Sequence, residues 1–111
     1  MQIRVVAVPS DLRAQVRVYA EYRIFSRLAS LARQIGDVDV VVTDAVLDAP
    51  ASCAATANLG TAGRVTAKVK RRQPIEAIDG AAASLADLVA RRLEQQTEEG
   101  VQRWSLKSKS F

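Results

Sequence analysis

Hydrophobic and polar residues alternate in three stretches of the chain, and this period of two predicts β-strands at residues 2–8, 38–43 and 64–70. The positions expected to face a core are Ile3, Val5 and Ala7, then Val38, Val40 and Val42, then Val65, Ala67 and Val69. A weaker strand is expected from Cys53 to Leu59, because alanine has little β preference. The glycines at positions 60 and 63 indicate a hairpin turn after it.

Two longer stretches have the period of an α-helix. From residue 10 to residue 35 there is no glycine or proline, and apolar residues recur every three or four positions. We expect this helix to begin at Ser10-Asp11 and to have Gly36 as its C-terminal cap. A second helix is expected from Pro74 to about Gln96, with Glu76 and Asp79 suited to the positive end of its dipole.

The pattern therefore gives the order strand, long helix, three strands, helix, which is an α+β fold. Beyond residue 96 the helical period ends, so we expect one domain over residues 1–96 and a flexible tail over residues 97–111. The residues expected to be most buried are Val38, Val40, Val42, Val65, Val69, Leu28, Ile78, Leu85 and Leu88.

Composition narrows the class of protein. The chain has 111 residues, 49% of them hydrophobic, which suits one small globular domain. No apolar run approaches the ~20 residues that span a bilayer, and the N-terminus lacks the pattern of a signal peptide, so we expect a cytoplasmic protein without a membrane partner. Cys53 is the single cysteine, which leaves no intramolecular disulfide or cysteine metal cluster.

Charge is unevenly distributed along the chain, although the net value is only +4. Residues 1–33 contain six arginines and two acids, residues 34–63 four aspartates and no basic residue, and residues 64–72 five basic residues and no acid. Such segregation favours a polyanionic partner, while a solvated basic face without a partner is the alternative.

Groups for catalysis are scarce. The absence of histidine removes the commonest general base and transition-metal ligand. Cys53 lies among alanines, where a buried and inert thiol is favoured over a nucleophile. Asp37 and Asp39 share a strand face and could hold a hard cation, but a solvated strand edge is the favoured explanation, because no third oxygen ligand lies at a suitable spacing. We therefore expect no enzyme activity, no cofactor and no small-molecule substrate.

Basic side chains form the best candidate site. Arginines one turn apart occur twice on the first helix, lysines share a face of the last strand, and two arginines lie late in the last helix. The expected RNA-binding residues are Arg13, Arg17, Arg23, Arg27, Lys68, Lys70, Arg71, Arg72, Arg91 and Arg92. Since no aromatic residues fall in the strand pattern of a base-stacking platform, structured RNA contacted through its phosphates fits best.

The order of elements, together with Ala55-Thr56-Ala57-Asn58-Leu59, Val65-Thr66-Ala67 and Ala77-Ile78-Asp79-Gly80, resembles the ribosome hibernation-promoting factors, also called the ribosome-associated inhibitor family. Phe25, Arg27-Leu28 and Ile35 match the family's pattern on its long helix. The resemblance covers about residues 1–95 and is to the short form of the family, which lacks a second domain.

This resemblance implies a β-α-β-β-β-α fold with both helices on one face of a four-stranded sheet. It also implies binding to small-subunit rRNA near the decoding region and inhibition of translation in idle or stressed cells. It assigns basic contacts to Arg23, Arg27 and Arg91, and we expect a monomer when the protein is free. Two alternatives remain open: a protein–protein interaction module that has lost RNA binding, and, less favoured, a small enzyme.

Overall fold

The computed structural model describes the backbone of residues 1–9 and 14–109 and the side chains of residues 1–9 and 14–96. Its main elements, in chain order, are β1 (Gln2–Val8), α1 (Ala14–Leu28), β2 (Asp37–Thr43), β3 (Ala51–Asn58), β4 (Arg64–Arg71) and α2 (Pro74–Lys109). Two 3₁₀ turns, η1 (Ala29–Gln34) and η2 (Gly60–Ala62), lie between them. The predicted α+β class and order of elements are confirmed.

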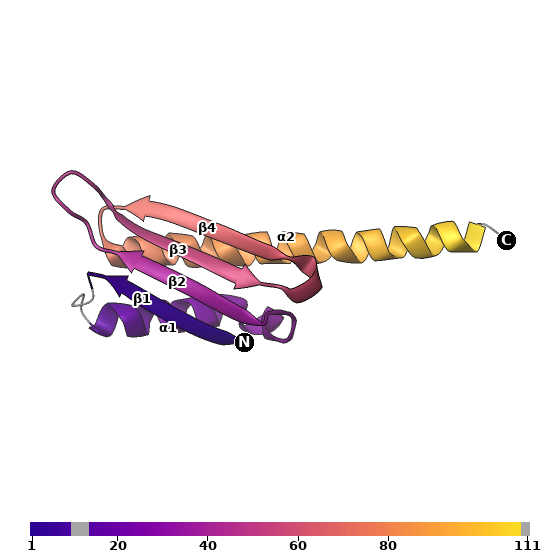
Figure 1. The fold of residues 1–111 in the computed structure, drawn as a ribbon, viewed down its shortest axis with the longest axis horizontal. Coiled ribbons are helices and arrows are strands. Elements are labelled where there is room, and N and C mark those ends of the chain that lie inside the picture. The colour runs from indigo at the N-terminus through magenta and orange to yellow at the C-terminus, as the bar shows by residue number, and fades with distance from the viewer. Residues whose placement is uncertain (10–13, 110–111) are drawn as a thin grey trace.

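The sheet has the strand order β1-β2-β3-β4. Helix α1 returns the chain between β1 and β2, which are therefore parallel, while β2, β3 and β4 pair antiparallel. Both helices cover the same face of the sheet, as the resemblance implied, and leave the other face open (Figure 1). None of the helices, over the residues described, is long and apolar enough to cross a membrane.

The core lies between the sheet and the helices, where the predicted alternation places it. The predicted inward residues of β2, Val38, Val40 and Val42, are at most 1% exposed, and Leu28, Ile78 and Leu85 are fully buried. The prediction was wrong for Val69 and Leu88, which are only partly buried. Val69 lies near the end of the edge strand β4, and Leu88 lies at the border of the buried stripe of α2, so both keep contact with solvent.

The first helix ends earlier than predicted. Helix α1 stops at Leu28, and the chain continues as the 3₁₀ turn η1 before Ile35 becomes extended. Gly36 is not a left-handed cap, because the only positive φ angles belong to Gly60 and Gly63 among the residues described. Instead, its N–H donates to Asn58 O and its C=O accepts from Gln2 N, so Gly36 is held by the sheet and does not cap a helix.

The last helix continues past the predicted end near Gln96 and runs to Lys109. A helix of 36 residues is about 54 Å long, and α2 projects beyond the sheet (Figure 1). The domain boundary at residue 96 and the flexibility of residues 97–111 stay predictions, and the side chains of that segment lie outside those described. The predicted helix start at Ser10-Asp11 also lies outside the described residues.

Candidate nucleic-acid interface

Four predicted basic residues meet at the C-terminal end of β4. Lys68 and Lys70 point from the open face of the sheet, and Arg71 and Arg72 follow at the strand end. All four are exposed, and within residues 1–9 and 14–96 their only side-chain hydrogen bond runs from Arg71 Nη1 to Lys70 O at 2.8 Å. We call Lys68, Lys70, Arg71 and Arg72 the β4 cluster. Its charges are available to an external anion.

The β4 cluster curves around the edge of the sheet. By the alternation of the strand, Arg71 lies on the same side as Val69, which is the helix side, whereas Lys68 and Lys70 lie on the open side. The guanidinium of Arg71 lies beside Gly80 in α2. A partner that contacts all four charges must therefore follow the end of β4 from one face to the other, as a curved phosphate backbone can.

The predicted arginines of α1 differ from one another. Arg17 and Arg27 are exposed, whereas Arg23 is half-buried and its Nε lies 3.2 Å from Asp79 Oδ1 in α2. Sequence reasoning missed this contact, because it assigned Asp79 to the helix dipole. Arg13 lies outside the described residues.

Asp79 also accepts a hydrogen bond from the hydroxyl of Tyr19. This bond, with burial and the negative charge of Asp79, raises the pKa of Tyr19. The aspartate within Ala77-Ile78-Asp79-Gly80 therefore joins α2 to two residues of α1. Since an arginine held in this way has less freedom to contact RNA, Arg23 is better explained as a link between the helices.

The arginines of α2 lie far from the β4 cluster. Arg92 Nη1 donates to Ala62 O at 3.2 Å in the turn that precedes β4, and Arg91 forms an ion pair with Asp87 at 3.1 Å. Along β4, Lys68 lies about 13 Å and Arg71 about 23 Å from Arg64, which follows this turn. The predicted set therefore does not form one continuous patch.

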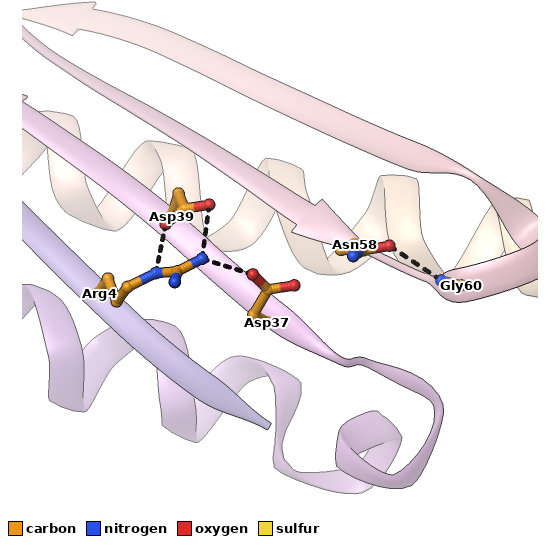
Figure 2. A network of polar contacts seen from close by, with 5 residues as sticks. All are labelled: Arg4, Asp37, Asp39, Asn58 and Gly60. Carbon is orange, nitrogen blue, oxygen red and sulfur yellow. Dashed lines mark hydrogen bonds and ion pairs between the residues drawn. The ribbon is translucent and has the colours of Figure 1, made fainter.

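The open face of the sheet carries charges of both signs. Arg4 Nη2 contacts Asp37 Oδ2 at 2.5 Å and its Nε donates to Asp39 Oδ1 at 2.8 Å, as Figure 2 shows. The hydrogen bond and charge of Asp39, followed by Asp37, raise the pKa of Arg4. Asp37 and Asp39 share a face as predicted, but Arg4 occupies their oxygens. No cluster of metal-ligating side chains occurs in the described part of the chain.

Cys53 is fully buried under the helices, as the sequence predicted. Burial raises the pKa of its thiol to about 11, so the thiolate is scarce at neutral pH. Since the thiolate is the reactive form, the observed role of Cys53 is packing in the core.

No protein-family model matches the sequence, and a search of curated proteins gives no match. Among solved structures, a ribosomal subunit interface protein from Coxiella burnetii matches with a TM-score of 0.69 at 13% identity, covering 82% of this chain and 96% of that one. The N-terminal domain of Protein Y from Thermus thermophilus matches with a TM-score of 0.63 at 24% identity, covering 82% and 98%. These neighbours confirm the resemblance stated from the sequence at the level of the fold.

Proposed function

We propose that this protein associates with the ribosome by contacting small-subunit rRNA, without catalysing a reaction. The observation that carries the proposal is the β4 cluster, which presents four exposed basic side chains on a fold shared with a ribosomal subunit interface protein. Phosphate oxygens are the natural partners of such a cluster, since arginine and lysine donors meet them with charge-assisted hydrogen bonds. On α1, Arg27 is an exposed basic residue that adds the same chemistry on the helix side.

By analogy with the family that the sequence resembles, we place the protein near the decoding region, where its presence would exclude mRNA and tRNA and would inhibit translation in idle or stressed cells. Occupying this site, without a chemical reaction, would be sufficient to inhibit translation. The protein would then act in the cytoplasm.

Sedimentation of a cell lysate through a sucrose gradient tests ribosome association directly. We expect the protein to travel with small subunits or whole ribosomes at low salt and to leave them as salt increases, because phosphate contacts lose affinity steeply with salt. Addition of the protein to a cell-free system should lower translation. A protein that stays at the top of the gradient at every salt concentration would contradict the proposal.

Internal pairing of three predicted arginines favours a second function. Arg23 pairs with Asp79, Arg91 with Asp87, and Arg92 with the carbonyl of Ala62, so these charges are partly used within the chain. A protein–protein interaction module that keeps the fold but not the RNA contacts is consistent with them. Its binding would depend little on salt, which distinguishes it from a phosphate-binding protein in the same gradient experiment.

A further inference from the structure

The two edges of the sheet differ in how they are protected. β4, at one edge, carries Arg64, Lys68, Lys70 and Arg71, and charged residues on an edge strand prevent it from pairing with another chain. β1, at the other edge, carries one charged residue, Arg4, which is already bound by two aspartates. Val6 and Val8 on the same strand are exposed. β1 therefore lacks the protection that β4 has.

The backbone of β1 has hydrogen-bonding groups that face outward. Gln2 N donates to Gly36 O and Val8 O accepts from Asp44 N, so the even-numbered residues point toward β2. By alternation, the N–H and C=O groups of Ile3, Val5 and Ala7 point away from the sheet. In the described part of the chain the one side chain that reaches them is Arg17, whose Nη2 lies 3.5 Å from Val5 O. A hydrogen bond this long is easily displaced.

An apolar groove lies beside this edge, between β1 and α1. It has a volume of about 530 Å³ and is lined by Met1, Ile3, Val18, Glu21, Tyr22 and Phe25. Val18, Tyr22 and Phe25 recur at helical spacing and are 66%, 64% and 53% exposed. A helix stripe of this kind normally packs against a partner, and it adjoins the unpaired strand. The strand edge and the groove form one surface.

The charges beside the groove are self-complementary. Arg17 and Glu21 lie one turn apart on α1, and neither forms an ion pair within residues 1–9 and 14–96. In a twofold dimer the same patch meets itself, so a residue of one copy faces a different residue of the other. With the axis near Val5, the antiparallel copy would bring its Glu21 to Arg17 and its Arg17 to Glu21. Two ion pairs would form at once.

We propose that β1 and the outer face of α1 form a homodimer interface. The two β1 strands pair antiparallel about a twofold axis near Val5 and join the two sheets into one, while the exposed side chains of Val18 and Tyr22 pack across the axis. This dimer replaces the free monomer expected from the sequence. It uses the edge of the sheet opposite the β4 cluster, and it does not depend on whether the protein binds RNA.

Charge reversal at Arg17 and Glu21 gives a sharp test. Sedimentation equilibrium of the wild-type protein from about 1 µM to about 1 mM should show a monomer–dimer equilibrium. Arg17→Glu and Glu21→Arg each create two repulsive pairs in a homodimer, so each should weaken dimerisation on the order of tenfold. A mixture of the two variants has only attractive pairs and should recover a tight one-to-one heterodimer. Loss of folding cannot produce that recovery.

A proline variant tests the strand pairing itself. Val5→Pro removes an N–H that points away from β2, so the β1–β2 ladder stays intact while the dimer loses one central hydrogen bond from each copy. It should be monomeric with an unchanged circular dichroism spectrum. Leu47→Asp is the matched control, because Leu47 is 99% exposed in the loop between β2 and β3, and it should dimerise like wild type.

Two results would overturn the proposal. A protein that is monomeric over the whole concentration range has no such interface, and the groove would then accept an extended segment of another protein. A dimer that is equally tight in both charge-reversal variants, with no gain on mixing, forms through a different surface. Binding to small subunits is measured separately, so neither result bears on the proposed function.

Discussion

Replacement of Gly80 by alanine tests how closely α2 approaches β4. A Cβ at this position would lie 2.9 Å from Val69 Cγ1, well inside the ~3.5–4.0 Å at which carbon atoms normally pack. Valine is branched at Cβ and has few alternative rotamers, so it cannot turn away freely. Alanine in place of glycine in a helix stabilises by roughly 0.5–1 kcal/mol, whereas overpacking costs about 1–3 kcal/mol. We expect a net loss of about 1 kcal/mol in the free energy of unfolding.

Urea unfolding followed by circular dichroism measures this change, and a second background isolates its cause. In a Val69→Ala protein the obstructing methyl group is absent, so Gly80→Ala should now stabilise the fold by roughly 0.5–1 kcal/mol. The diagnostic result is that Gly80→Ala lowers the free energy of unfolding in the wild-type background and raises it in the Val69→Ala background. Equal stabilisation by Gly80→Ala in both backgrounds would show that α2 does not pack against Val69 as described.

Three further predictions concern the interior and its links. Leu85→Ala should lower the free energy of unfolding by about 2–5 kcal/mol in the same urea assay, because Leu85 is fully buried between α2 and the sheet; a loss below about 0.5 kcal/mol would contradict its burial. The raised pKa of Tyr19 means that the folded state favours the neutral phenol, so its stabilising effect is complete below about pH 10 and is lost as pH rises through the folded-state pKa. Thermal unfolding between about pH 8 and about pH 11 should therefore show a steeper loss for wild type than for Tyr19→Phe, and parallel curves would refute the bond to Asp79. A thiol reagent should modify Cys53 only at the rate of unfolding, since its pKa is raised to about 11 by burial, and rapid labelling of the native protein would contradict this.

The sequence pattern was sufficient for the strands and for most of the core. Alternation along residues 38–43 and 64–70 identified the buried faces of β2 and β4 because each strand has one face toward the helices and one toward solvent. The end of α1 could not be found in this way. The 3₁₀ turn η1 follows α1, and Gly36 beyond it bonds to both Gln2 and Asn58 instead of capping a helix; partners so distant in sequence leave no local signal.

The candidate site, like the fold, was predictable from the sequence only in part. The β4 cluster was predictable, since Lys68, Lys70, Arg71 and Arg72 are neighbours along one strand. The role of Arg23 was not predictable, because its ion pair with Asp79 joins residues 56 positions apart in the chain. The sequence therefore identified the basic residues, but only the packing of α1 against α2 showed that the charge of Arg23 is already paired.

The salt dependence of small-subunit binding shows directly whether the β4 cluster contacts phosphates. We expect the affinity of the wild-type protein for purified small subunits to fall steeply with salt. The variant with Lys68→Ala, Lys70→Ala, Arg71→Ala and Arg72→Ala should bind more weakly, with a log–log slope smaller in magnitude by roughly 0.7 to 0.9 for each phosphate that the variant no longer neutralises.

Two controls accompany this measurement. Exposed charges add little to stability, so the variant should stay folded. Replacement of Asp44 and Asp48 by asparagine, in the loop between β2 and β3, should leave the slope unchanged. Two single variants give a comparison at equal net charge. Arg33→Ala removes one positive charge, as Lys70→Ala does, but Arg33 lies in η1, so Arg33→Ala should weaken small-subunit binding less than Lys70→Ala. A folded quadruple variant that binds small subunits with the wild-type slope would contradict the account, because the β4 cluster would then contact no phosphate.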